Sequence, residues 1–489
     1  MINLKSSVFF AILWSFATRM SLKLLGLAST IILARLLEPG DFGLMALAMS
    51  FYAIVDLLGA FGLDIALIQK RGMKDSHLNT AWTVKFLVGL ISSCVLALSA
   101  HQVAAFYNEP GLVELLHCIA VVFFLNGLTN IGIVVFQKEL DFKKEYIFQM
   151  SSKIISFITT IFLAYCLRSY WALVIGFIVN QMSTVVISYM ISSYRPKVSF
   201  YKAKELFSFS GWIFINEWIR FINNRVSELV IGKLLNPASV GIYKIGEEFG
   251  SLPFAEITAS INRASLPGYS KAQTDMEQLK SLFFDIQATI SLVSLPASVG
   301  LYIIAPTFVP WVLGEKWLLS IPILQSIALA SAFLSFSSNT SYVFLALGRP
   351  GLSTFLGLLR VSLFFPLLMV MTKSDGAQGA ADALFYTAIV MTVLPILVVS
   401  RIVGIQITEY FKAISSGICG ALAMLLVNQF AVTATAFGGA PGFLALSSEI
   451  LCYGGVFCIV VLSLWLIKGK PDGLESKALR FIKEYRHSS

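Results

Sequence analysis

Basic residues recur on one face of a long apolar segment near the N-terminus. Within residues 9–33, five small or polar residues follow one another at helical intervals: Ser15, Arg19, Lys23, Gly26 and Thr30. Spacings of three and four residues keep side chains on one face of a helix. Arg and Lys are the side chains that hold phosphate, Arg through two parallel hydrogen bonds. The pattern predicts a cationic stripe that faces a cavity and binds an anionic ligand through Arg19 and Lys23. Snorkelling of Lys23 to an interface is the alternative.

A second polar face lies in segment 207–232. It comprises three amides, an arginine and a serine: Asn216, Arg220, Asn223, Asn224 and Ser227. Two pairs of opposite charge, each three residues apart, lie on the same segment: Glu217 with Arg220 and Arg225 with Glu228. This spacing also allows ion pairs within one helix, which make burial tolerable. We predict that Arg220 and the three amides contact a hydroxyl-rich ligand. For Arg225, ligand binding and ion pairing remain equal alternatives.

Carboxylates inside apolar segments are candidates for carrying a coupling ion. A low dielectric favours the neutral form of a carboxyl group, which allows it to take up a proton. The predicted ion-coupling set contains six acidic residues: Asp56, Asp64, Glu217, Glu228, Glu247 and Glu248. Asp56 and Asp64 are eight residues apart, so a continuous helix would place them on roughly one side. A static ion pair with Arg19 or Lys23 is the alternative for such a residue.

Four other basic residues lie inside apolar segments: Lys85, Lys153, Arg360 and Lys244, which lies one turn from Glu247 and Glu248. Arg360 has no acidic neighbour in its segment, so we expect it to line a cavity or to pair with a distant acid. Lys85 and Lys153 lie close to the ends of their segments, and snorkelling to an interface explains both. The six cysteines form no CxxC pair and only four histidines are present, so no metal site and no cofactor are predicted.

The composition shows which elements must position these residues. Of 489 residues, 57% are hydrophobic and only 13% are charged, with a mean hydropathy of +0.80. An average soluble domain is about 25% charged. We therefore predict an all-α integral membrane protein, because a membrane helix needs about 20 apolar residues. Fourteen segments qualify: 9–33, 42–68, 80–105, 112–136, 147–167, 170–192, 207–232, 239–262, 286–313, 318–347, 351–371, 380–400, 411–431 and 450–467.

Basic residues between the segments indicate the orientation of the chain. With the N-terminus in the cytoplasm, cytoplasmic segments hold 23 of the 36 Lys and Arg residues and the outer loops hold 5. Cytoplasmic loops of membrane proteins carry this excess. We therefore predict that both termini are cytoplasmic and that segment 9–33 is a retained span. The basic tail, 468–489, is expected to rest on anionic lipid headgroups.

An internal repeat organises the segments. Residues 35–43 read RLLEPGDFG and residues 233–241 read KLLNPASVG, at an offset of 198. Six predicted spans separate the two copies, so the repeats are parallel. This predicts two six-helix lobes, residues 1–205 and 206–405, around a central cavity. Two appended helices in 406–467 and the tail complete the chain. The alternative is that Pro and Gly occur at these positions only because they are common in short turns between helices, without any repeat.

Four short motifs carry a resemblance to a known family. They are residues 33–44 (LARLLEPGDFGL), 136–142 (FQKELDF), 313–317 (LGEKW) and 347–350 (LGRP). In order and spacing they resemble polysaccharide flippases of the Wzx type, in the colanic-acid-exporter-like branch. These belong to the multidrug/oligosaccharidyl-lipid/polysaccharide exporter superfamily. The matching region covers roughly residues 10–370.

The resemblance implies a non-enzymatic transporter in the bacterial inner membrane. It would move an undecaprenyl-pyrophosphate-linked oligosaccharide between leaflets by alternating access, with possible H⁺ or Na⁺ coupling, beside the polymerase and export machinery. The substrate-binding candidates are then the eight basic and amide residues of the spans: Arg19, Lys23, Asn216, Arg220, Asn223, Asn224, Arg225 and Arg360. A cation- or drug-exporting antiporter is the first alternative, although its cavity should be net acidic. A membrane polymerase or glycosyltransferase is the second, but such enzymes usually need a large outer loop with catalytic residues, and the longest predicted outer loop, about 432–449, holds only Glu449 as a charge. A non-transporting scaffold would not need buried charged stripes.

Overall fold

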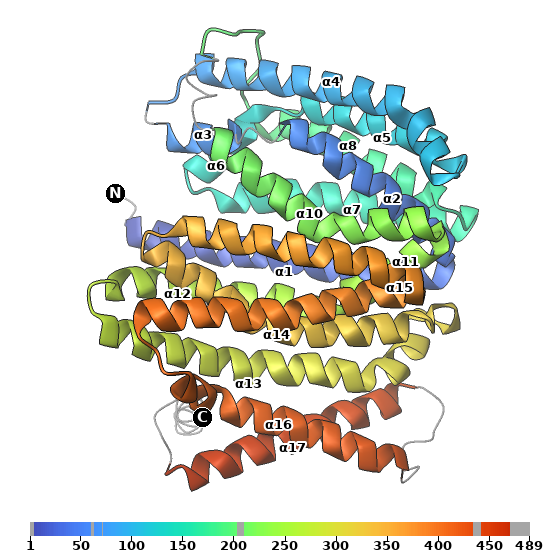
Figure 1. Cartoon of the computed structure of the whole chain (residues 1–489). Helices are drawn as coiled ribbons and strands as arrows, with labels where there is room; N and C mark the ends of the chain where they lie inside the picture. Colours follow the sequence, from blue (N-terminus) through green and yellow to red (C-terminus); the bar gives the residue numbers. More distant parts are fainter. Residues whose placement is uncertain (1–3, 60–62, 71, 203–209, 434–441, 470–489) are drawn as a thin grey trace, which may run out of the picture. The chain divides into compact units, whose positions relative to one another are not determined.

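The computed structural model describes residues 4–59, 63–70, 72–202, 210–433 and 442–469, and this part of the chain contains helices and turns but no strand (Figure 1). The predicted all-α class is confirmed. The chain divides into two compact units, Met1–Gly241 and Ile242–Ser489. The lobe boundary drawn from the repeat, at 205/206, stays a prediction.

The first unit is built from paired helices. Its elements are α1 (Leu4–Leu36), α2 (Pro39–Asp56), α3 (Leu63–Gln69), α4 (Asp75–Tyr107), α5 (Gly111–Leu128), α6 (Val134–Lys138), α7 (Phe142–Leu167), α8 (Trp171–Ile191), α10 (Ser210–Leu234) and the first turn of α11 (Pro237–Gly250). The main packing pairs are α4 with α5, α7 with α8 and α1 with α7. Helix α10 packs on α2.

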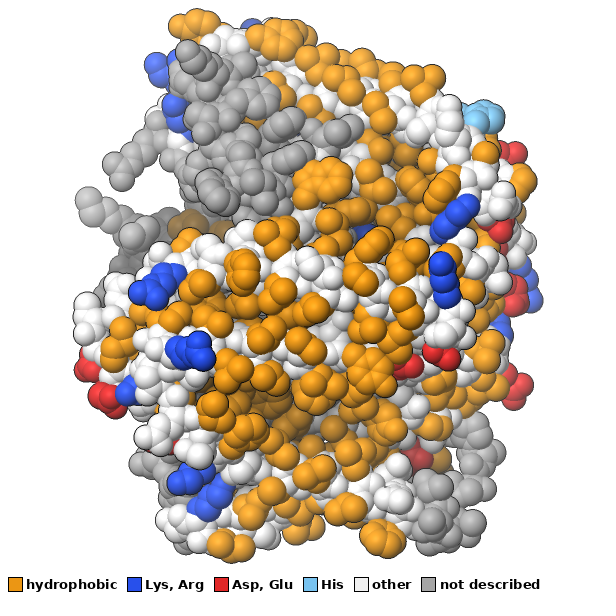
Figure 2. Space-filling model, viewed as in Figure 1, with side chains coloured by type: hydrophobic (Ala, Val, Ile, Leu, Met, Phe, Trp, Pro, Cys, Tyr) orange, Lys and Arg blue, Asp and Glu red, His pale blue; other side chains and the backbone are white. Residues whose placement is uncertain are grey.

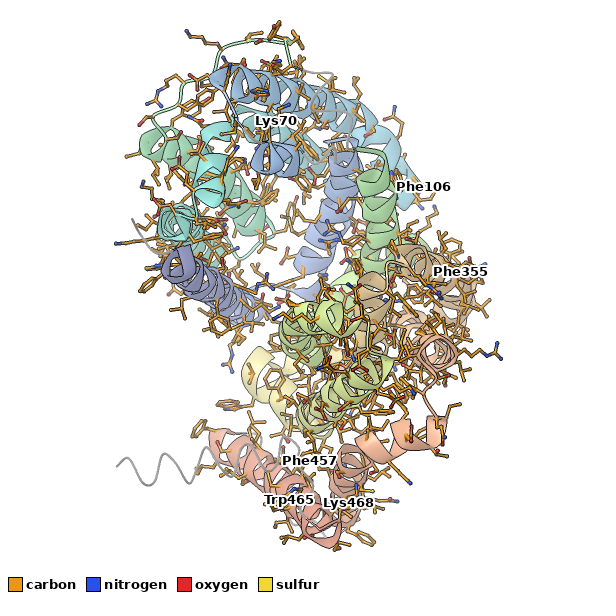
Figure 3. The ribbon with its side chains drawn as sticks, turned by 90° about the vertical axis from the view of Figure 1, so that its left-hand side faces the viewer. Lys70, Phe106, Phe355, Phe457, Trp465 and Lys468 are labelled. Atoms are coloured by element: carbon orange, nitrogen blue, oxygen red, sulfur yellow. The ribbon has the colours of Figure 1, made fainter. Side chains whose placement is uncertain are left out.

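The second unit continues with longer helices. They are α12 (Ala259–Ala272), α13 (Met276–Phe308), α14 (Ser320–Ala346), α15 (Pro350–Val403), α16 (Ile407–Thr433) and α17 (Phe443–Ile467). Helix α13 packs against both α14 and α16, and α16 pairs with α17. Lys468 follows α17 directly (Figure 3). Its ammonium group donates hydrogen bonds to the hydroxyls of Ser415 and Ser416 on α16, at 2.9 and 3.0 Å, and so links the ends of α16 and α17.

The surface of the helices suits a lipid solvent. Ten of the described helices are long and apolar enough to cross a membrane. Figure 2 shows hydrophobic side chains over the middles of the helices and charged side chains toward their ends. Leu98, Met190 and Leu444 are 76–82% exposed, which water would penalise and lipid does not. The chain is a multi-pass integral membrane protein.

Three predicted continuous segments are interrupted. Segment 42–68 forms α2, a 3₁₀ turn at Leu57–Gly59 and α3, whereas we expected one helix. Asp56 and Asp64 therefore lie on two different helices, and the prediction that one continuous helix carries both is wrong. Segment 112–136 breaks at Asn130, whose side chain accepts a hydrogen bond from the Gly132 amide at 2.8 Å and so stabilises a turn.

The third interruption follows from a proline. Segment 239–262 forms α11, a π-helical turn at Pro253–Thr258 and α12. Pro253 has no backbone N–H, so the regular ladder of α11 cannot continue through it. A hydropathy window is blind to these breaks, because it averages the few polar residues beside them over many apolar ones.

Helix α15 is long enough for two crossings. It contains 54 residues, but Gly376 has φ 62° and ψ −141°, a backbone conformation that favours glycine. A Cβ atom at Gly379 would fall on the Met371 carbonyl group, which is possible only if the chain turns back between them. The split predicted between segments 351–371 and 380–400 therefore coincides with this reversal.

The two copies of the repeat meet in the first unit. Helices α2 and α11 begin at Pro39 and Pro237, 198 residues apart. A Cβ atom on Gly43 would fall on the Pro237 carbonyl, and one on Gly241 would fall on the Pro39 carbonyl. Because the contact is reciprocal, equivalent residues of both copies cross around a local two-fold axis. The glycines of the repeated motif are thus needed for close approach of two backbones.

We expect Gly43→Ala to destabilise the protein by about 1–3 kcal/mol, because its methyl group meets backbone atoms that cannot rotate away. Gly40→Ala is the matched control, since a Cβ there meets nothing within 4 Å. The thermal midpoint of the purified full chain in detergent is the measurement. Equal midpoints for the two variants would show that the crossing is not close.

Candidate functional site: a polar cavity in the first unit

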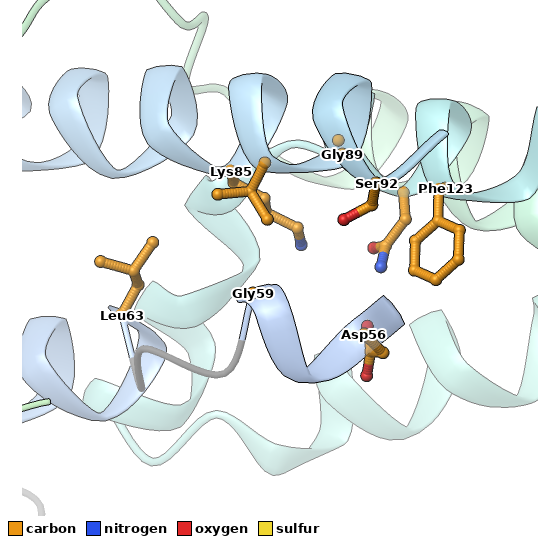
Figure 4. A pocket seen from close by; sticks show the side chains of 10 residues that line it. Asp56, Gly59, Leu63, Lys85, Gly89, Ser92 and Phe123 are labelled. Carbon is orange, nitrogen blue, oxygen red and sulfur yellow. The ribbon is translucent and has the colours of Figure 1, made fainter. Parts of the chain in front are cut away.

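A polar cavity of about 260 Å³ opens between α2, α4 and α5 (Figure 4). Its polar lining comes from four residues: Asp56, Lys85, Ser92 and Asn126. Phe123 and Val88 supply apolar walls. The cavity lies between helices that otherwise expose apolar side chains and are long enough to cross a membrane, where hydrogen-bonding groups are costly.

Helix geometry positions each polar group. Lys85 and Ser92 are seven residues apart on α4, which is two helical turns, so both point to the same side. Gly89 lies between them, and a Cβ there would come within 2.7 Å of the Phe123 carbonyl oxygen. Without a side chain at this position, α4 and α5 pack closely and Asn126 reaches the cavity. Asp56 is the last residue of α2 and lines the cavity from that helix.

Lys85 is a residue whose role we misread in the sequence. We expected it to snorkel, but Figure 4 shows its side chain directed into the cavity, and it is part of the lining. The helix starts at Asp75, earlier than predicted, so Lys85 lies almost three turns inside it. The signal available in the sequence was its helical spacing from Ser92.

The ligand candidates of α10 lie in the electrostatic field of this cavity. The charge of Asp56 interacts with Lys85, Glu217 and Arg220. Arg220 pairs with Glu217 through its guanidinium, yet 69% of its side chain is exposed. The structure therefore brings together four charged residues. Asp56, Glu217 and Arg220 were candidates in the sequence, and Lys85 was not. Arg220 keeps donors available for a ligand.

Arg225 and Glu228 form the second pair that the spacing allowed. Arg225 Nη1 donates to both carboxylate oxygens of Glu228 at 3.1 Å. Only 1% of the Glu228 side chain is exposed, and Ser50 on α2 contacts its Oε2 at 2.5 Å. This buried triad links α10 to α2.

The remaining α10 amides differ in their surroundings. Asn223 donates to the Ile219 carbonyl at 2.8 Å, and its Oδ1 is buried without a partner among the described residues. Asn224 is exposed. The side chains of Asn216 and Asp64 lie outside the described residues.

The cationic stripe of α1 is accessible but separate from the cavity. Arg19 is exposed and Lys23 is half-buried. Neither belongs to the lining of the polar cavity. Their predicted ligand role stays a prediction.

Three candidates of the second unit form no comparable cavity lining in the part of the chain described. Lys244 pairs with Glu247 at 2.8 Å, within α11. Glu248 is half-buried beside them. Arg360 on α15 is half-exposed, and its Nε is buried without a hydrogen-bond partner among the described residues. Among the described residues, no three His, Cys, Asp or Glu side chains are grouped to hold a metal ion.

A row of hydrogen-bonded Ser, Thr and Asn side chains in the second unit was not predicted from the charged residues. Thr258 donates to Ser335 at 2.9 Å, and Ser335 lies 2.7 Å from Ser294. Asn262 donates to Ser338 at 2.8 Å. Such hydrogen bonds join membrane helices, here α12, α13 and α14. Serines recurring every three or four residues on α13 and α14 were the available signal.

Comparisons with known proteins agree with the helical architecture and the motifs. A family model described as polysaccharide biosynthesis protein matches residues 32–322. The chain is 26% identical over 422 residues to an uncharacterized membrane protein in the cps region of Klebsiella pneumoniae, covering 85% of this chain and 87% of that one. It is 24% identical over 406 residues to the lipopolysaccharide biosynthesis protein WzxC of Escherichia coli, covering 82% of each.

A solved structure shares the fold. The Lipid II flippase MurJ in an inward closed conformation matches with a TM-score of 0.74, at 16% identity, over 93% of this chain and 99% of that one. The relatives and the apolar helices place the chain among multi-pass proteins of the bacterial inner membrane. The resemblance to Wzx-type flippases seen in the motifs is confirmed. By the extent of the family match, more than half of its length, the chain belongs to the polysaccharide biosynthesis protein family.

Proposed function

We propose that this protein is a flippase that translocates undecaprenyl-pyrophosphate-linked oligosaccharide units across the inner membrane for surface polysaccharide synthesis. The observation that carries the proposal is the polar cavity, with Asp56, Lys85 and the nearby exposed Arg220, inside an otherwise apolar helical unit. A membrane protein keeps such groups at depth where a polar substrate passes. Family membership and the fold shared with the Lipid II flippase support the same conclusion.

The two ends of the substrate need different groups. We infer that the pyrophosphate is held by Arg19, Lys23 and Arg220, because guanidinium and ammonium groups form charge-assisted hydrogen bonds with phosphate. The accessibility of Arg19 and Arg220 supports this assignment. The proposed substrate set is completed by five further residues: Asn216, Asn223, Asn224, Arg225 and Arg360.

We further propose a topology of fourteen crossings with both termini in the cytoplasm. The described helices fit this count if α2 with α3, α5 with α6 and α11 with α12 form one span each, and α15 forms two. Alternating access between two lobes around a central cavity is part of the same proposal.

We place the coupling proposal on Glu228. The Ser50 hydroxyl has one proton but two acceptors in reach, the Ala46 carbonyl at 3.0 Å and Glu228 at 2.5 Å. A protonated Glu228 could donate to Ser50 while Ser50 donates to Ala46. The contact between α2 and α10 would then persist in both protonation states, which suits a carboxyl group that takes up and releases a proton.

Deletion of the gene in the source bacterium tests the function. We expect surface polysaccharide to be lost and lipid-linked repeat units to accumulate on the inner leaflet. Restoration by the wild-type chain is the control. Export of single unpolymerised units in the deletion strain would contradict the proposal and indicate a polymerase.

A further inference from the structure

We propose that the polar cavity between α2, α4 and α5 binds one uncharged sugar ring of the transported glycan; this rests on the proposed function and names the part of the substrate that the cavity recognises. The cavity is lined by one carboxylate, one ammonium, one amide and one hydroxyl, from Asp56, Lys85, Asn126 and Ser92. Its opposite charges balance, so it is not built for a charged ligand of either sign.

The functional groups match those of a sugar. Every sugar hydroxyl donates and accepts hydrogen bonds, so it needs partners of both kinds. Asp56 accepts, Lys85 donates, and the amide of Asn126 does both. Phe123 and Val88 give the cavity an apolar wall against which the C–H face of a ring can pack. Phe123 is itself fixed by stacking on Tyr52, with ring centroids 4.4 Å apart.

The size of the cavity selects a single ring. A volume of about 260 Å³ is roughly nine times the share of one water molecule in the liquid, about 30 Å³. Drug-sized ligands occupy sites of about 300–1,000 Å³. The cavity therefore holds one sugar ring, and the remaining rings of a longer glycan would lie outside it.

Other small ligands are disfavoured by the same residues. A phosphate or a uronic acid carboxylate would be attracted by Lys85 but repelled by Asp56, and a metal cation or a cationic drug the reverse, so neither gains a net charge interaction. Like charges in a low dielectric repel strongly. Asp56 is exposed, so the cavity is open to an entering ligand.

Binding to the purified full chain, measured by native mass spectrometry, tests the assignment. The probes are undecaprenyl pyrophosphate, the same lipid carrying one glucose, and the same lipid carrying one glucuronic acid. We expect the glucose probe to bind about tenfold more tightly than the bare lipid, since it adds several hydrogen bonds. The glucuronic acid probe should also bind more tightly than the bare lipid, but by a smaller factor than the glucose probe.

Variants of the cavity residues test whether the tighter binding of the glucose probe depends on this cavity. Asn126→Ala and Ser92→Ala, which change no charge, should remove most of the tenfold preference for the glucose probe while leaving the affinity for undecaprenyl pyrophosphate unchanged. Ser93→Ala is the control, because Ser93 neighbours the cavity residue Ser92 on α4 but does not line the cavity. It should keep the full preference. An equal loss for both lipids in the cavity variants would overturn the assignment.

The two proposals fail in distinguishable ways. If the wild-type chain binds the glucose probe and the bare lipid equally, the sugar site is wrong and the flippase proposal stands. If it binds no undecaprenyl pyrophosphate species at all, the proposed function fails, and the sugar site fails with it.

Discussion

Arg225→Ala is expected to destabilise the protein by about 3 kcal/mol, because it removes the guanidinium that pairs with the buried Glu228 carboxylate. Glu228 is 1% exposed and both of its oxygens accept from Arg225. Glu228 can take up a proton in the variant, which lowers the free-energy cost of burying its carboxyl group. The loss of stability therefore lies at the lower end of the range of about 3–5 kcal/mol for broken buried ion pairs. The thermal midpoint of the purified chain is the measurement.

Two variants separate stability from transport at this pair. Asn224→Ala, on the exposed neighbour of Arg225, should leave the midpoint unchanged. Glu228→Gln keeps the shape of the side chain and its contact to Ser50, so it should fold well yet transport without response to a pH gradient. A wild-type response to the gradient in Glu228→Gln would contradict the coupling proposal.

Loss of Arg19 or Arg220 is expected to abolish export while the protein still inserts and folds. Each charged hydrogen bond to the pyrophosphate contributes about 1.5–3 kcal/mol, which corresponds to a tenfold or greater loss of affinity per arginine. Both side chains are largely exposed, so little stability depends on them. Export is measured as surface polysaccharide in the complemented deletion strain.

The conservative variants sharpen this prediction. Arg19→Lys and Arg220→Lys should keep part of the export, because lysine retains the charge but not the two parallel hydrogen bonds. Lys153→Ala is the control, since that residue belongs to neither the proposed site nor the cavity lining. Full export in both alanine variants would remove the arginines from the substrate site.

Much of the fold could be predicted from the sequence because hydropathy is a property of each segment alone. Each predicted segment overlaps at least one described helix, and the repeated motif with Pro39 and Pro237 starts α2 and α11 at equivalent positions. The breaks at Leu57–Gly59 and Asn130 were missed because they depend on local hydrogen bonds and turns. These do not change the mean hydropathy of a window.

The site was less predictable because it depends on partners far apart in the chain. The pairs Glu217–Arg220 and Arg225–Glu228 were readable from their spacing. The contact of Glu228 with Ser50 joins residues 178 positions apart and has no sequence signal. Spacing places Lys85 and Ser92 on one face of α4, but that this face lines a cavity follows only from the packing of α4 with α2 and α5.

A leaflet-specific assay in proteoliposomes tests the central claim most directly. The purified chain is reconstituted with a lipid-linked oligosaccharide, and an impermeant reagent that oxidises or binds the glycan reports how much substrate lies in the outer leaflet over time. We predict that the wild-type chain makes all of the substrate accessible, whereas protein-free liposomes and the double variant Arg19→Ala/Arg220→Ala leave about half protected. Half-protection that persists with the folded wild-type chain, with or without proton and sodium gradients, would contradict the assignment as a flippase.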